Sequence, residues 1–358
     1  MKTTTDRQGA SAVGVDSRLS NVADSQATPA ETSAWMVSPL FDLLFFANIG
    51  WVVLLIPAAL SVTAVESVEF WQIYFITTPH RWITLLLVAT DPDRRGGRTA
   101  LFLLIAAVTV AIVFGARLVG GAFVCLAMID LVWNGWHFAS QHAGILRIYS
   151  RKAGGGRRTL EMYGLRTFVF YVTLRMIGWL TGWTELNPTV AGILPWIDGA
   201  MLSLPALLLA VELFNGAARR PAKVIYLTSV SAIYACLLLG ASTGNKPLVL
   251  WLVLGTALFH AIEYLAIVTH YAWRRRTVGG PAPFQAMAKH WLLVLAAFVV
   301  CLGLVASFAE RSDFTSEHQW LFEFWVGFNL CTAFLHYAYD GMIWKLRKPA
   351  TARALGTS

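Results

Sequence analysis

Long apolar runs recur along most of the chain, and short polar segments separate them. Many of the runs reach the roughly 18 residues expected of a helix that crosses about 30 Å of hydrocarbon. Short strands of alternating polarity, which a β-barrel would need, are not evident. The pattern therefore predicts an all-α, polytopic integral membrane helix bundle. We count about ten transmembrane helices, at 40–62, 68–90, 99–118, 120–147, 162–183, 191–214, 223–242, 247–272, 287–308 and 320–344.

Composition agrees with this pattern. Of the 358 residues, 57% are hydrophobic and only 13% are charged, whereas a soluble domain has about 25% charged residues. The mean hydropathy is +0.59. The net charge of +8 does not indicate nucleic acid as a partner, because the basic residues lie in short loops between the spans.

The charges of these loops alternate along the chain. Loop 91–98 has three arginines, and loop 151–158 has four basic residues. Basic residues also follow the sixth, eighth and tenth spans, whereas the alternate loops hold only Lys246 and Arg311. Because cytoplasmic loops are rich in Lys and Arg, we expect both termini in the cytoplasm. The expected location is the cell's inner (cytoplasmic) membrane, as a multi-pass protein.

Three regions follow from this pattern. Residues 1–36 are rich in Ser, Thr, Ala and Asp and predict a disordered cytoplasmic tail. Residues 37–346 form the transmembrane helical domain, and 347–358 form a short cytoplasmic tail. The chain also has four cysteines, all in apolar segments and none at CxxC spacing, which predicts small buried side chains.

Ionisable residues inside the spans are costly in hydrocarbon and mark functional sites. Here they occur in four of the spans that would run from outside to inside. They are His80, His137, His142, His260, Glu263, His270, His336 and Asp340. Apart from His270 and Asp340, they lie 9 to 14 residues before the next charged cytoplasmic segment. At about 1.5 Å per residue they share a layer roughly 13–21 Å from the cytoplasmic loops.

Helical spacing places many of these groups on common faces. Asn134, His137 and Gln141 share a face, whereas His142 points well away from His137. A second span places His260 and Glu263 on one face. Asn329, His336 and Asp340 also fall on one face. The bundle is therefore expected to enclose a polar interior.

Imidazoles at one depth on several helices predict a metal site. The candidate ligands are His80, His137, His260 and His336, with His142 and His270 as further candidates. Glu263 and Asp340 are the candidate catalytic carboxylates, which could also ligate the metal or orient the imidazoles. Arg81, Asn134, Gln141 and Asn329 are candidates for contact with the substrate or with the ligands. Imidazole with carboxylate favours iron, with zinc and copper as alternatives.

Several polar residues receive a plainer interpretation. His290 and His318 lie at or beyond the ends of spans and are left out of the site. Glu212 and Asp198 lie near the ends of the sixth span and are expected to be solvated. A single intramembrane histidine more often makes a helix–helix hydrogen bond than it binds a metal. The absence of a CxxCH motif disfavours covalently attached haem.

Two short segments resemble part of a known family. "TPHR", with Pro79 and His80, and "WHF", with His137 and Phe138, are similar to segments of the bacterial Brp/Blh-like carotene dioxygenases. That group is a set of polytopic membrane iron oxygenases with isolated histidines on several spans. The Gly and the paired "DH" of its first motif are missing here. The resemblance implies the chemical class and does not imply carotene as substrate.

Three functions are compatible with these observations. The first is a membrane-embedded oxidoreductase or oxygenase with non-haem iron, a lipophilic substrate and O₂. The second is a proton- or metal-ion-coupled transporter that uses the same His, Glu and Asp cluster. The third is an assembly protein whose polar residues join helices.

Overall fold

The computed structural model describes most of the chain beyond residue 33. It describes residues 34–62, 66–119, 122–182, 188–214, 220–276, 282–311 and 319–345, together with 351, 352, 355 and 356. These residues are almost entirely helical and include no strand, so the all-α class is confirmed. Most of the predicted tail 1–36 lies outside the described residues. Of its last residues, Met36 is buried and its amide donates a hydrogen bond to Asp42.

The N-terminal third is built from short, interrupted helices. Its elements are α1 (Pro39–Phe41), η1 (Asp42–Phe46), η2 (Ile49–Leu54), α2 (Leu55–Ala59), α3 (Glu66–Gln72), η3 (Ile73–Thr77), α4 (Thr78–Thr90) and α5 (Pro92–Arg95). The remaining elements are mostly long. They are α6 (Thr99–Leu118), α7 (Ala122–Lys152), α8 (Arg158–Leu180), α9 (Pro188–Phe214), α10 (Pro221–Ser242), α11 (Lys246–Arg275), α12 (Ala282–Lys289), α13 (Trp291–Arg311) and α14 (Gln319–Ile343).

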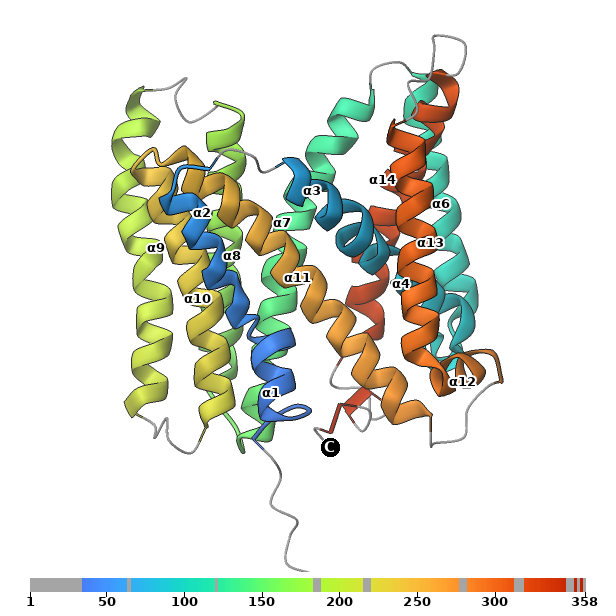
Figure 1. The fold of residues 1–358 in the computed structure, drawn as a ribbon, viewed down its shortest axis with the longest axis horizontal. Coiled ribbons are helices and arrows are strands. Elements are labelled where there is room, and N and C mark those ends of the chain that lie inside the picture. The colour runs from blue at the N-terminus through green and yellow to red at the C-terminus, as the bar shows by residue number, and fades with distance from the viewer. Residues whose placement is uncertain are drawn as a thin grey trace, which may run out of the picture. The chain divides into compact units, whose positions relative to one another are not determined.

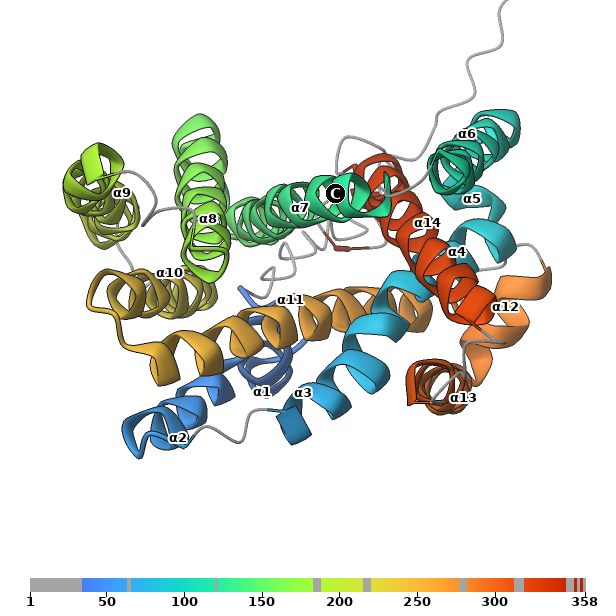
Figure 2. The same cartoon turned by 90° about the horizontal axis from the view of Figure 1, so that it is seen from above.

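Helix α11 occupies a central place among the other elements (Figures 1 and 2). It runs beside α7, with α8, α9 and α10 towards one end and α4, α6, α13 and α14 towards the other. The segments η1 to α2 cover another side of it. Burial reflects these positions. Of an apolar 18-residue stretch in each helix, 61% is buried in α11, against 11% in α6 and 22% in α9. Helices α6 and α9 therefore present most of their apolar side chains outwards.

Within the described part of the chain, four helices are long and apolar enough to cross a membrane, namely α6, α9, α10 and α11. Two bent pairs raise the number to six if each counts as one span: residues 39–59, bent by 46°, and residues 283–307, bent by 98°. These six segments coincide with six of the ten predicted spans. Helices α7, α8 and α14 have the length of a span but are not among these six segments. Several membrane-spanning helices are thus supported, and the full count of ten stays a prediction.

A π-helical turn, η3, directly precedes α4, and Pro79 lies in the first turn of α4. Pro79 lacks an N–H, and its ring crowds the carbonyl four residues earlier, at Phe75. Phe75 lies within η3, where the wider π turn relieves this crowding. Helix α13 packs closely against the turn: a β-carbon on Gly303 would lie 2.7 Å from the Phe75 ring and 2.9 Å from the Tyr74 carbonyl. Helix α13 can therefore pack this closely against the turn because residue 303 is glycine.

Two carboxylates expected to be solvated are instead buried, and that expectation was wrong. Glu212 is 3% exposed and Asp198 is 4% exposed. Lys223 Nζ donates to Glu212 at 2.5 Å and to Glu161 at 2.8 Å. Asp198 accepts a hydrogen bond from Tyr171 at 2.5 Å. Neighbouring helices supply these partners, and the position of a residue near the end of one span does not reveal them.

Candidate metal centre

Four histidines from four different helices meet in one closed ring of contacts. They are His80 on α4, His137 on α7, His260 on α11 and His336 on α14. The centroid of the His80 imidazole lies 5.1 Å from that of His260 and 5.0 Å from that of His336. That of His137 lies 4.9 Å from that of His260 and 4.7 Å from that of His336. The structure thus brings together the four imidazoles that the sequence placed at one depth.

The four imidazoles are buried and poorly satisfied. Their exposed fractions are 2% for His80, 7% for His137, 1% for His260 and 0% for His336. His80 Nδ1, His137 Nε2, His336 Nε2 and both nitrogens of His260 have no hydrogen-bond partner within the described part of the chain. A buried polar atom without a partner costs about 1–3 kcal/mol. Such a concentration of unpaired nitrogens fits a bound cation far better than helix–helix hydrogen bonding.

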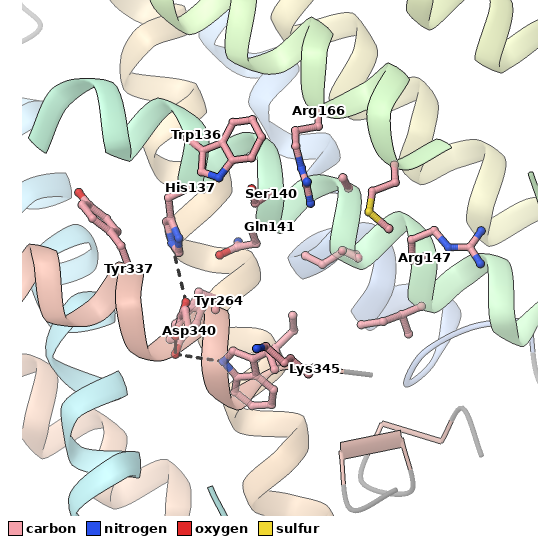
Figure 3. A pocket seen from close by; sticks show the side chains of 18 of the residues that line it. Trp136, His137, Ser140, Gln141, Arg147, Arg166, Tyr264, Tyr337, Asp340 and Lys345 are labelled. Carbon is pink, nitrogen blue, oxygen red and sulfur yellow. Dashed lines mark hydrogen bonds and ion pairs between the residues drawn. The ribbon is translucent and has the colours of Figure 1, made fainter. Parts of the chain in front are cut away.

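Asp340 adds a carboxylate to the ring. Its Oδ2 lies 3.8 Å from His137 Nε2 and 3.9 Å from His336 Nε2, and Figure 3 shows the approach of His137. The ligand atoms of His137, His336 and Asp340 lie within 4.8 Å of one another. Two ligand atoms on opposite sides of one transition metal are about 4.2 Å apart, because each bond is about 2.1 Å. The group therefore fits a metal with little movement of its side chains.

A second group of potential ligands shares one residue with the first. Ligand atoms of His80, His260 and His336 also lie within 4.8 Å of one another. His336 belongs to both groups, so the five residues can surround one ion or two adjacent ions. Neither group contains a cysteine.

A hydrogen-bonded network orients the ligands on one side. Tyr264 donates to Asp340 Oδ1 at 2.6 Å, and the Thr84 hydroxyl donates to the same oxygen at 3.2 Å. Thr84 Oγ1 also lies 2.7 Å from His336 Nδ1. If Thr84 donates to Asp340, it accepts from Nδ1–H of His336, which leaves the Nε2 lone pair free for a metal. Trp344 Nε1 completes the network by donating to Tyr264 at 3.3 Å.

The ring of His260 is positioned by stacking and through its backbone. The Phe138 ring stacks on it with centroids 4.1 Å apart and an angle of 20°. Gln141 Nε2 donates to the His260 carbonyl at 2.8 Å and to Glu263 at 3.1 Å. Contacts with Phe138 and Gln141 of α7 therefore fix the His260 imidazole, whose two nitrogens are both unpaired.

His142 and Glu263 lie in a separate polar cluster. His142 Nδ1 is 3.0 Å from a Glu263 oxygen, and both side chains are 0% exposed. The Tyr226 and Tyr234 hydroxyls each lie 3.3 Å from a ring nitrogen of His142. Glu263 thus pairs with His142 and belongs to neither group of potential ligands. Gln141 connects the two clusters.

The other candidates lie around the ring or away from it. His270 is buried, with Nε2 unpaired, but belongs to neither group of potential ligands in the described residues. Asn329 donates to the Trp325 carbonyl of its own helix at 3.0 Å. Arg81 has a buried Nε without a partner, and Asn134 is half-buried. His290 is exposed, and His318 lies outside the described residues.

Three residues of the network were missed from the sequence, and they share one spacing. Thr84, Tyr264 and Trp344 each follow a ring residue by four positions, after His80, His260 and Asp340 respectively. Residues four apart lie one above the other on a helix. A search for hydroxyl and indole groups one turn after each candidate ligand would have found all three.

A cavity of about 780 Å³ opens beside the ring. His137, Gln141, Tyr264, Tyr337 and Asp340 line it near the candidate ligands (Figure 3). Its size lies within the range of about 300–1,000 Å³ that is usual for small-molecule sites. A ligand in this cavity would therefore reach His137 and Asp340.

The described residues define an all-helical protein with several potential membrane spans and a buried cluster of four imidazoles and one carboxylate. No protein-family model, no curated protein and no solved structure matches the chain.

Proposed function

We propose that this protein is a membrane-embedded oxidoreductase, an oxygenase with non-haem iron, that acts on a lipophilic substrate. The observation that carries the proposal is the ring of four buried imidazoles with unpaired nitrogens, closed on one side by Asp340. The protein would lie in the inner membrane with ten spans and cytoplasmic termini. The alternation of basic loops supports that topology.

The set of ligands favours iron. His137, His336 and Asp340 supply two imidazoles and one carboxylate, which is the donor set of many non-haem iron oxygenases. These three residues would hold the iron, which would supply the chemistry that activates O₂. The three imidazoles of the second group would suit zinc or copper as well. Iron is therefore the first choice, and the other two metals are the alternatives.

The chain's own residues would hold and tune this site. Asp340 places a negative charge against the cation, and Tyr264 and Thr84 direct its free oxygen towards the histidines. Phe138 stacks on His260.

The substrate is proposed to enter from the bilayer. Trp133 and Trp136, which line the cavity, are 37% and 44% exposed on the surface of α7. An apolar molecule could therefore reach the cavity without passing through water. The two segments that resemble Brp/Blh-like dioxygenases contribute His80 and His137, both in the ring, which supports the chemical class.

A proton- or metal-ion-coupled transporter is the second candidate. The fully buried His142–Glu263 pair favours it, because Gln141 connects this titratable pair to the ring. Such a pair could pass protons alongside an ion. An enzyme retains its metal through purification, however, whereas a carrier must release its ion.

Metal analysis of detergent-purified protein tests the proposal. We expect about one transition-metal atom per chain, or two, with iron ahead of zinc and copper. His260→Ala should abolish metal binding while the protein remains folded, because both nitrogens of His260 lack protein partners that would be lost. His290→Ala, at an exposed histidine, is the matched control and should keep its metal. Folded wild-type protein without metal would refute the enzyme and favour the carrier.

A further inference from the structure

The cavity beside the ring is elongated along α7. Its lining on this helix begins at Trp133 and Trp136, passes His137 and Gln141, and ends at Arg151. From His137 to Arg151 the helix rises by about 21 Å. A ligand that fills the cavity would therefore be long, with one end beside the metal ligands and the other near the end of α7.

The cavity is strongly basic. Among the described residues, five cations line it, and Asp340 is the only carboxylate in its lining. The five are Arg147, Arg151, Arg158, Arg166 and Lys345. Arg147 is paired with Glu161, so its charge is already compensated.

Arg166 is the cation that topology does not explain. Arg151 and Arg158 belong to a basic loop, as expected on the cytoplasmic side. Arg166 instead lies within α8, about 12 Å along the helix from Arg158. It is half-buried, its Nε has no hydrogen-bond partner, and its guanidinium lies 5.0 Å from the centre of the Trp136 ring. In Figure 3 it extends from α8 towards the side of α7 that faces the cavity.

An apolar groove continues from the opposite end of the cavity. It has a volume of about 590 Å³ and is lined by Met128, Ile129, Val132, Trp133, Trp136 and Phe170. Trp133 and Trp136 line both spaces. Along α7 the apolar groove is therefore followed by His137 and then by Arg147 and Arg151.

We propose that the ligand of this site is a single-chain amphiphile with an anionic head group, a carboxylate or a phosphate. Arg166 holds the head group, because guanidinium binds both anions through paired hydrogen bonds. The chain passes His137 and Asp340, and its end lies in the apolar groove. The inference rests on the proposed function, and it narrows the substrate from any lipophilic molecule to an anionic lipid.

Equilibrium binding to metal-loaded, detergent-purified protein tests this inference. Palmitate should bind about 10- to 100-fold more tightly than hexadecanol, which has the same chain without the charge, since a hydrogen bond to a charged group contributes about 1.5–3 kcal/mol. Palmitoyl lysophosphatidate, compared with palmitate, identifies the preferred head group. Inorganic phosphate alone should bind weakly, because it lacks the chain.

Arg166→Gln should weaken palmitate binding to the level of hexadecanol and leave hexadecanol binding unchanged. Arg166→Lys should keep part of the preference, which shows that the charge is responsible even if the Gln variant folds poorly. Arg117→Gln is the matched control, because Arg117 pairs with Glu323 and does not line the cavity. Equal affinity for palmitate and hexadecanol, or an unchanged preference in Arg166→Gln, would overturn the inference.

Metal content measured on the same samples separates the two proposals. Protein that binds metal but shows no preference for palmitate would refute only the inference of an anionic ligand. A preference for the acid in protein that binds no metal would leave the lipid site and remove the metal-dependent function.

Discussion

The Thr84 hydroxyl lies 2.7 Å from Nδ1 of His336 and joins this imidazole to Asp340 on the next turn of α14. One small side chain on α4 therefore orients two candidate ligands on another helix. This relationship gives the site its clearest test apart from the ligands themselves.

Thr84→Val should weaken metal binding without abolishing it. Valine keeps the shape of threonine but removes the hydroxyl, so His336 loses the partner that fixes its tautomer. Loss of a group that orients a ligand weakens metal affinity by about 10–100-fold. Competition with a chelator would measure the change, and Thr84→Ser should restore most of the affinity. Wild-type affinity in Thr84→Val would show that the hydroxyl does not orient a metal ligand.

Glu263→Gln should lower stability and leave the metal content unchanged. In the structure Glu263 is a partner of His142 and Gln141 and belongs to neither group of potential ligands. Loss of a hydrogen bond between membrane helices costs about 0.6 kcal/mol, and up to about 1.7 kcal/mol. Thermal unfolding in detergent and metal analysis of the same sample would check both parts. A loss of metal would instead assign Glu263 to the metal site.

Lys223→Met should destabilise the protein strongly. Lys223 is 1% exposed and lies between Glu161 and Glu212, which would be left buried without their cation. Removing one partner of a buried ion pair typically costs about 3–5 kcal/mol. Thermal unfolding would measure the loss, with Lys246→Met, at the exposed start of α11, as control. The double variant Lys223→Met with Glu212→Gln should recover part of the stability, and no recovery would argue against direct coupling.

Topology can be tested by labelling cysteines introduced into loops of a variant that lacks the four native cysteines. Cysteines in 91–98, 151–158 and 274–286 should react only from the cytoplasmic side, where basic loops remain during insertion. A cysteine in 184–190 should react only from the opposite side. Labelling of 184–190 from the cytoplasm would mean that the number of spans between these loops is wrong.

The sequence predicted the depth of the ring but not its partners. Depth follows from a constant rise per residue, so counting from the basic loops was enough to place His80, His137, His260 and His336 in one layer. Which neighbour fills a given face depends on the packing of other helices. Helical spacing places Glu263 on the same face as His260, yet its carboxylate pairs with His142 of α7.

Burial near helix ends was equally hard to predict. Glu212 lies near the end of α9, where solvation is the usual outcome, but Lys223 on α10 reaches it. The hydroxyl and indole groups around the ring were missed for a different reason. Thr84, Tyr264 and Trp344 are ordinary residues of membrane helices, and only their position one turn after a ligand distinguishes them.

The π turn before α4 also changes the phase of the helix. A π turn contains one residue more than an α turn, which shifts every later side chain by about 100° relative to an uninterrupted α-helix. The side chains of α3 and those of α4 can therefore point in directions that one continuous α-helix would not allow. Deleting a single residue between Ile73 and Thr77 would remove this rotation. Helix α3 could then keep its own orientation only if His80 turned away from the other three imidazoles.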